Sequence, residues 1–174
     1  MAPTKGQAGN PRSSRGSDLP AEGKMRFRID RKKELPQQDR VFLLDTSALI
    51  AFAEDAAGAE IVEGVLREAA QGKARVLISF ISFMEGYSWI LRKEDEESAR
   101  NFYLYMKTLP IERVDIDERM IIKAGEIQAG FSLGVAASWI AASAIERRAT
   151  LIHCDPAFEQ IGQLVPLLAL GTKG

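Results

Sequence analysis

Three acidic residues stand at or soon after the ends of short apolar runs. Asp45 follows residues 41–44 in FLLDTSALIA, Glu85 lies shortly after residues 76–79 in ISFISFMEGY, and Asp155 closely follows residues 150–153 in TLIHCDPAF. Carboxylates brought close together repel one another unless a proton or a cation bridges them, and an all-oxygen cluster suits Mg²⁺ or Mn²⁺. Such an ion can activate a bound water and stabilise charge on a phosphodiester. We therefore expect a divalent-metal site.

Each of these acids also has a local structural explanation, which stays open at this point. Asp45, followed by Thr46 and Ser47, could cap a helix. Ser82 and Glu85 have the S-x-x-E spacing of a capping box. Asp155 precedes Pro156 and could be an ordinary turn or cap residue. The combination of all three at one edge of a sheet is what favours the metal site.

Hydrophobic periodicity predicts the elements that would position these acids. We expect strands at 41–44, 76–79, 111–115 and 150–153 and a weak edge strand at 164–168. Helices are expected from about residue 47, around 61–69, over 82–93, around 99–109, at 117–129 capped by Asp117, and at 132–148 capped by Ser132, with a helical turn after Pro156. Alternating strands and helices predict an α/β fold with a mostly parallel sheet of four to five strands between helices. Ligands bind such sheets at the carboxyl ends of the strands.

Composition divides the chain into a tail and one domain. Residues 1–40 carry ten Lys and Arg against five Asp and Glu, and the other residues carry 13 against 19. We expect a flexible basic tail at 1–40, a domain at 41–170 and a short tail at 171–174. One cysteine and one histidine exclude an internal disulfide and a zinc site built from His ligands. No apolar run approaches the roughly 20 residues that span a bilayer, so we expect no membrane partner. The single cysteine and histidine point to a reducing cytoplasm.

The acidic motifs resemble those of PIN domains. LLDTSALIA resembles the opening strand of that family, with its first metal-binding aspartate at Asp45 and its supporting hydroxyl residue at Ser47, and SFMEGY resembles the segment with the glutamate, Glu85. The stretch SLGVAASWIAASAIERRATLIHCDPAFEQI resembles the closing helix, strand and aspartate, with Asp155 and Phe158. The likeness extends from about Val41 to Leu168. It is strongest to the small VapC-like toxins of type II toxin–antitoxin pairs.

The chain departs from this family at one position. The third metal-binding acid of the closing helix would fall two residues before Trp139, and this sequence has Ala137 there. Neither Glu126 nor Glu146 is close enough in sequence to replace it, and Ser138 lies about 100° further around the helix. Ala137 is either a natural loss or a deliberate inactivating substitution. We favour the second explanation, because the residues around it still match a working member.

The resemblance implies a three-layer PIN-like fold and an endoribonuclease that uses Mg²⁺ or Mn²⁺, held by Asp45, Glu85 and Asp155. It also implies an RNA substrate, a cognate antitoxin and a homodimer. Without an acid at position 137 we expect impaired activity or none. The alternative is a non-catalytic interaction module with the same fold. A phosphoacceptor or nucleotide-binding domain is disfavoured, because no glycine-rich loop follows the first strand and no lysine is placed to contact an acyl phosphate.

Overall fold

The computed structural model describes residues 40–171. The predicted tail at 1–40 and the tail at 171–174 fall almost entirely outside the described residues. No helix within the described part of the chain is long and apolar enough to cross a bilayer.

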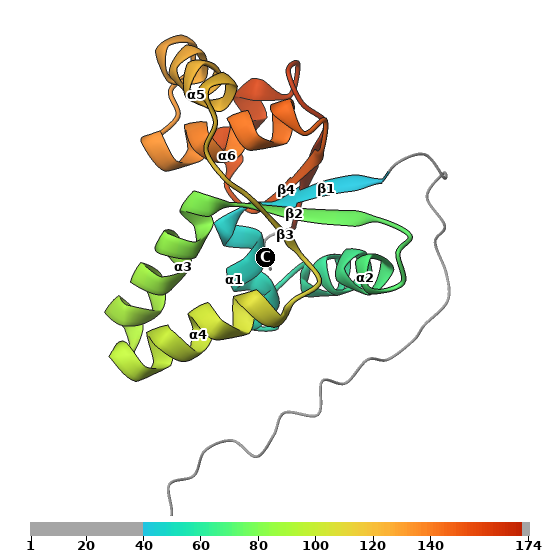
Figure 1. Cartoon of the computed structure of the whole chain (residues 1–174), viewed down its shortest axis with the longest axis vertical. Helices are drawn as coiled ribbons and strands as arrows, with labels where there is room; N and C mark the ends of the chain where they lie inside the picture. Colours follow the sequence, from blue (N-terminus) through green and yellow to red (C-terminus); the bar gives the residue numbers. More distant parts are fainter. Residues whose placement is uncertain (1–39, 172–174) are drawn as a thin grey trace, which may run out of the picture. The chain divides into compact units, whose positions relative to one another are not determined.

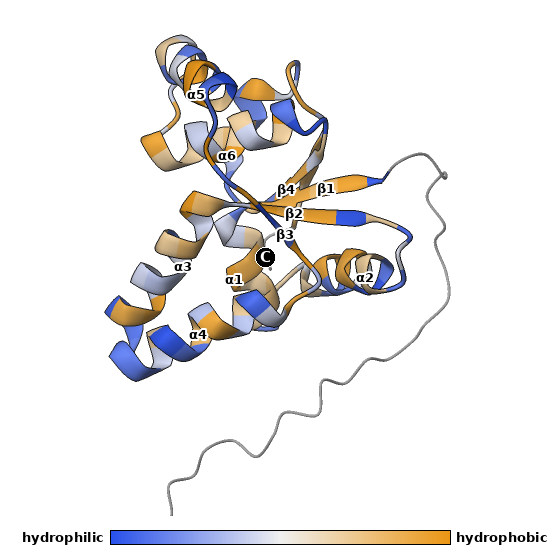
Figure 2. Cartoon of the chain, in the orientation of Figure 1, coloured by the Kyte–Doolittle hydropathy of each residue, from blue (hydrophilic) through white to orange (hydrophobic). Residues whose placement is uncertain are grey.

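A five-stranded parallel sheet forms the centre of the fold (Figure 1). Its strand order is β3-β2-β1-β4-β5, so the first strand of the chain lies in the middle, between β2 and β4. The three central strands are apolar along most of their length and are covered on both faces, as parallel strands usually are (Figure 2). The strands are β1 (Val41–Leu44), β2 (Arg75–Ser79), β3 (Glu112–Val114), β4 (Thr150–His153) and β5 (Leu167–Ala169).

Six α-helices and one 3-10 helix connect the strands. They are α1 (Thr46–Ala53), α2 (Ala59–Ala70), α3 (Phe80–Lys93), α4 (Glu96–Thr108), α5 (Glu118–Gly130), α6 (Val135–Glu146) and η1 (Pro156–Ile161). Figure 1 shows α5 and α6 on one side of the sheet and α1 and α2 on the other, with α3 and α4 paired as a hairpin. This arrangement confirms the predicted α/β fold with helices on both faces of the sheet.

The strand residues divide between two apolar cores because successive side chains of a strand point to opposite faces. Leu43 packs with residues of α5, α6 and η1. Its neighbours Phe42 and Leu44 pack with residues of α1 and α2. β1 is thus packed on both faces. This packing positions Asp45, the residue that follows the strand.

Two helix starts differ from the sequence prediction. α3 begins at Phe80 directly after β2, with Ser79 as its N-cap residue, and Ser82 is fully buried inside the helix. The alternative explanation of Ser82 and Glu85 as a capping box is therefore wrong. α6 begins at Val135 after Gly134, so Ser132 is not its cap, whereas the predicted Asp117 cap is confirmed by the Met120 amide at 2.9 Å.

Candidate functional site

Asp45 lies at the centre of the candidate site, at the end of β1. Its side chain accepts hydrogen bonds from the amide of Ser47, at 3.1 Å, and from the Ser47 hydroxyl. It therefore caps α1, and the capping interpretation of Asp45 is correct. The residue is 5% exposed, and this burial raises the pKa of its carboxyl above the ordinary value. The hydrogen bonds from Ser47 oppose that rise, and the negative charge of Glu85 adds to it.

Glu85 lies in the second turn of α3, close enough to Asp45 for their charges to interact. Its Oε2 accepts a hydrogen bond of 2.6 Å from Oγ1 of Thr46, the first residue of α1. Both carboxylates thus lie near the carboxyl edge of β1 and β2, and their joint binding of a metal stays a prediction. The sequence interpretation does not include Thr46, because nothing in the Asp45-Thr46-Ser47 run indicates a partner 39 residues away.

Asp155 follows β4, the other neighbour of β1, and so lies at the same edge of the sheet. Its side chain is exposed and accepts a hydrogen bond of 2.8 Å from the amide of Ala157, which caps η1. The backbone carbonyl of Asp155 is held by His153 Nδ1 at 2.8 Å. Within residues 40–171 no group of three or more Asp, Glu, His or Cys side chains is close enough to hold a metal. The structure thus joins Asp45 and Glu85 and leaves Asp155 in a local cap.

The Ser47 hydroxyl links the first and last of these acidic segments. It donates to Asp45 and accepts a hydrogen bond of 2.9 Å from the amide of Cys154, the residue before Asp155. Burial raises the pKa of the Cys154 thiol, and the charge of Asp45 adds to that rise. The thiol is thus held in its protonated form beside the carboxylate. Ser47 thus bonds both to Asp45 and to the residue before Asp155, and its supporting role at a metal site stays a prediction.

Position 137 lies in the first turn of α6, where the side chain of Ala137 is partly buried against the core on the α5–α6 side. The next residue, Ser138, is buried and donates to the carbonyl of Gly134 in its own helix. Its hydroxyl is thus occupied and does not replace a missing acid. The acidic residue of α6 is Glu146, at the opposite end of the helix.

The chemistry of the pair of acids suits a hard divalent cation. Mg²⁺ in proteins is usually held by one or two carboxylates together with several waters, so Asp45 and Glu85 meet its minimum requirement. A cation between them would offset both the mutual repulsion of the pair and the burial of Asp45.

The sequence pattern of the PIN domain matches residues 42–164, which include all three acids and most of the chain. The chain belongs to the PIN domain family. No curated protein sequence matches it.

Solved structures with the same fold come from toxin–antitoxin complexes. This PIN domain matches a chain of VapBC2 from Rickettsia felis bound to a promoter DNA fragment, with a TM-score of 0.59 and 20% identity over 75% of this chain and 99% of that one. It matches a chain of DNA-bound VapBC from Salmonella typhimurium with a TM-score of 0.59 and 21% identity over 76% and 98%. It matches a chain of VapBC-5 from Mycobacterium tuberculosis with a TM-score of 0.52 and 16% identity, over 75% of this chain and 97% of that one. At these identities the likeness establishes the fold.

Proposed function

We propose that this PIN domain is a metal-dependent endoribonuclease and the toxin of a toxin–antitoxin pair, impaired by Ala137. The observation that supports the proposal most strongly is the buried Asp45 beside Glu85, at the edge of the sheet where α/β folds bind ligands. A buried carboxylate with a raised pKa and a charged neighbour is typical of a functional site. The toxin assignment also draws on the VapBC structures.

The proposed ion is Mg²⁺ or Mn²⁺, with Asp45, Glu85 and Asp155 as its protein ligands. When bound, it would activate water and stabilise charge on the RNA phosphodiester. The carboxylates would hold the ion. The Ser47 hydroxyl orients Asp45 by a hydrogen bond, and the Thr46 hydroxyl orients Glu85 in the same way. None of these side chains needs to act as a nucleophile, so the reaction needs no covalent intermediate with the protein.

Ala137 explains why the site is incomplete. The small side chain leaves α6 without a carboxylate in its first turn, and Asp155 is engaged with the Ala157 amide. With no carboxylate at position 137, and with Asp155 having to leave its cap to reach the ion, metal binding should be weak and the attacking water poorly positioned. We therefore expect little or no cleavage by the chain as it stands.

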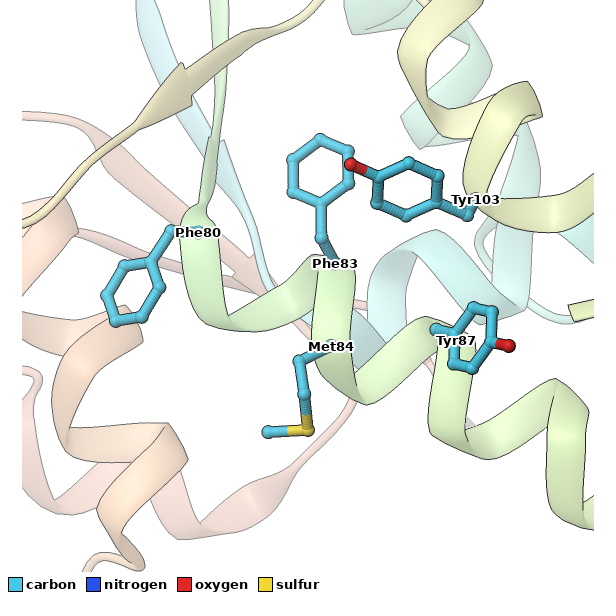
Figure 3. A pocket seen from close by; sticks show the side chains of 5 residues that line it. All are labelled: Phe80, Phe83, Met84, Tyr87 and Tyr103. Carbon is cyan, nitrogen blue, oxygen red and sulfur yellow. The ribbon is translucent and has the colours of Figure 1, made fainter. Parts of the chain in front are cut away.

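An apolar face on α3 supports a protein partner. Phe80, Met84, Tyr87 and Leu91 follow one another at spacings of four, three and four residues, the pattern by which two helices pack together. Met84 is 55% exposed and Leu91 is 43% exposed. Figure 3 shows the hollow along this face, lined by Phe80, Phe83, Met84, Tyr87 and Tyr103.

We propose that this α3 face, defined by Phe80, Met84, Tyr87 and Leu91, joins two copies of the chain in a homodimer. A cognate antitoxin is the second proposed partner, since the similar structures are toxin–antitoxin complexes. None of the residues that line the hollow is one of the three acids, so dimerisation would leave these carboxylates free. We propose that the reaction takes place in the cytoplasm, because a single cysteine suits reducing conditions.

A second candidate function is a non-catalytic interaction module. It is favoured by the absence of a three-acid cluster within residues 40–171 and by Ala137. The two candidates differ in what a restored carboxylate would do. A module that has lost its chemistry in several places would not regain it through one side chain.

The deciding experiment compares the chain with its Ala137→Asp variant in cleavage of single-stranded RNA, with Mn²⁺ and with EDTA. Calorimetry measures Mn²⁺ binding to both proteins in parallel. We expect weak binding and almost no cleavage from the parent, and tighter binding with metal-dependent cleavage from Ala137→Asp. The double variant Ala137→Asp/Asp45→Asn is the control and should be inactive. Equal metal affinity and no cleavage in parent and variant would reject the nuclease and favour the interaction module.

A further inference from the structure

We infer that Thr46 is a positioning residue for metal binding, and that it acts by holding the Glu85 carboxylate beside Asp45. The inference rests on the proposed function, because it assigns a role within the same site. Thr46 follows Asp45 directly in the chain, so its hydroxyl and the Asp45 carboxylate are fixed by the same turn of backbone at the start of α1. The hydrogen bond of 2.6 Å to Glu85 Oε2 therefore ties the second acid to the position of the first.

The burial of Thr46 allows this hydrogen bond to restrict the side chain of Glu85. Thr46 is 8% exposed, whereas Glu85 is only partly buried and belongs to a helix with an exposed face. A glutamate side chain has several rotatable bonds, and a single short hydrogen bond from a buried, β-branched donor restricts them strongly. Within the described residues no hydrogen bond reaches Glu85 Oε1, which is left available for a ligand.

A simpler explanation is that the Thr46 hydrogen bond only holds α1 against α3. A second link between these helices allows the two explanations to be distinguished. The same pair of helices is linked at its other end by an ion pair between Glu54, the C-cap residue of α1, and Lys93 of α3. That link is exposed and lies at the far ends of both helices, away from Asp45. Breaking it loosens the helix pair without touching Glu85, so Glu54→Gln is a matched control for docking alone.

The test measures Mn²⁺ affinity by calorimetry in the full-length Ala137→Asp protein, to which single changes are added. Thr46→Val keeps the shape and removes the hydroxyl, and Thr46→Ser keeps the hydroxyl. Loss of a residue that orients a metal ligand typically weakens metal binding about 10-fold to 100-fold. We expect a loss of about 10-fold for Thr46→Val, near-parent affinity for Thr46→Ser and for Glu54→Gln, and similar melting temperatures for the two Thr46 variants.

A double-mutant cycle with Glu85→Gln decides whether Thr46 acts through Glu85. Once Glu85 is a poor ligand, Thr46→Val should cost no further affinity. Unchanged affinity in Thr46→Val overturns the inference, as does an equal loss in Glu54→Gln or a full loss that persists beside Glu85→Gln. If Ala137→Asp itself binds Mn²⁺ and cleaves RNA in those cases, the proposed function stands without the role of Thr46. If no variant binds Mn²⁺, both fall.

Discussion

The amide of Cys154 donates a hydrogen bond of 2.9 Å to the hydroxyl of Ser47, although the two residues are 107 positions apart in the chain. The same hydroxyl donates to Asp45. One small side chain thus fastens the carboxyl end of β4 to the start of α1. It adds to the backbone hydrogen bond of 2.9 Å by which the Asp45 amide reaches the carbonyl of Ile152 in β4.

Replacing Ser47 with Ala should destabilise the protein, because both hydrogen bonds are lost and the Cys154 amide has no replacement partner. Leaving a part-buried polar group unpaired costs about 1–3 kcal/mol, and urea denaturation measures the change. The control is Ser88→Ala, which removes a hydroxyl that contacts Arg92 on the exposed surface of α3. Equal stability of the two variants would show that water replaces the Ser47 hydroxyl without cost.

Asp45→Asn should stabilise the metal-free protein at neutral pH. Burial raises the pKa of Asp45 in the folded state above its ordinary value of 3.8. A raised pKa means that the native state favours the protonated form, so the stability associated with that proton is present below pH 3.8 and is lost as the pH rises through the folded pKa. Asparagine has no such loss, and it can still accept from the Ser47 amide.

Melting temperatures of the parent and Asp45→Asn in EDTA, from pH 4 to pH 8, check this expectation. The advantage of Asp45→Asn should grow as the pH rises. Mn²⁺ should then raise the melting temperature of the parent more than that of the variant, since a ligand stabilises the state that binds it. Destabilisation of Asp45→Asn by the same amount at every pH would mean that helix capping outweighs the cost of burying the charge.

Two glycines within helices should respond in opposite ways to alanine. In α3, a Cβ added at Gly86 would lie 2.9 Å from Phe102 Cε1 and 3.3 Å from Met106 Sδ, both in α4. In α5, a Cβ at Gly125 would meet nothing within 4 Å. We expect Gly86→Ala to cost about 1–3 kcal/mol through overpacking and Gly125→Ala to gain up to about 1 kcal/mol through helix propensity. A gain for both variants in urea denaturation would show that α4 moves aside freely.

Met84→Glu should convert the proposed homodimer to a monomer without lowering the melting temperature. Met84 is 55% exposed, so a charge there disturbs the α3 face and not the core. Sedimentation velocity over a range of concentrations distinguishes the two states. Leu164→Glu is the control, because Leu164 is similarly exposed, at 49%, and lies outside that face. Loss of the dimer in both variants, or in neither, would contradict the α3 interface.

Local patterns in the sequence predict most of the fold, because the strands are short apolar runs and most helices repeat apolar residues at helical spacing. Asp45 and Asp117 could be assigned as caps for the same reason, since a cap bonds to its own neighbours. The predicted helix starts are wrong where more than one nearby residue could act as the N-cap. The Ser82–Glu85 spacing is that of a capping box, but β2 runs directly into α3, so the cap position falls at Ser79.

The contacts between distant segments could not be read from local spacing. Thr46 meets Glu85 because β1 and β2 are adjacent and parallel, and the sequence alone does not give that register. Asp155 was expected to join them, and its position at the edge is right. Its side chain bonds to Ala157 instead, because the turn at Pro156 offers a free amide two residues away.

The central place of β1 in the strand order has a consequence for synthesis. β1 is made first among the strands, but its two neighbours are β2 and β4, and β4 is the fourth strand to be made. At about 5–20 residues per second, the 107 residues between Ser47 and Cys154 take roughly 5–20 s to synthesise. Until then one edge of β1 has no partner strand, and the Ser47 hydroxyl lacks its hydrogen bond from the Cys154 amide. The growing chain therefore cannot bring Asp155 to the sheet edge that holds Asp45 and Glu85 before most of the domain has been translated.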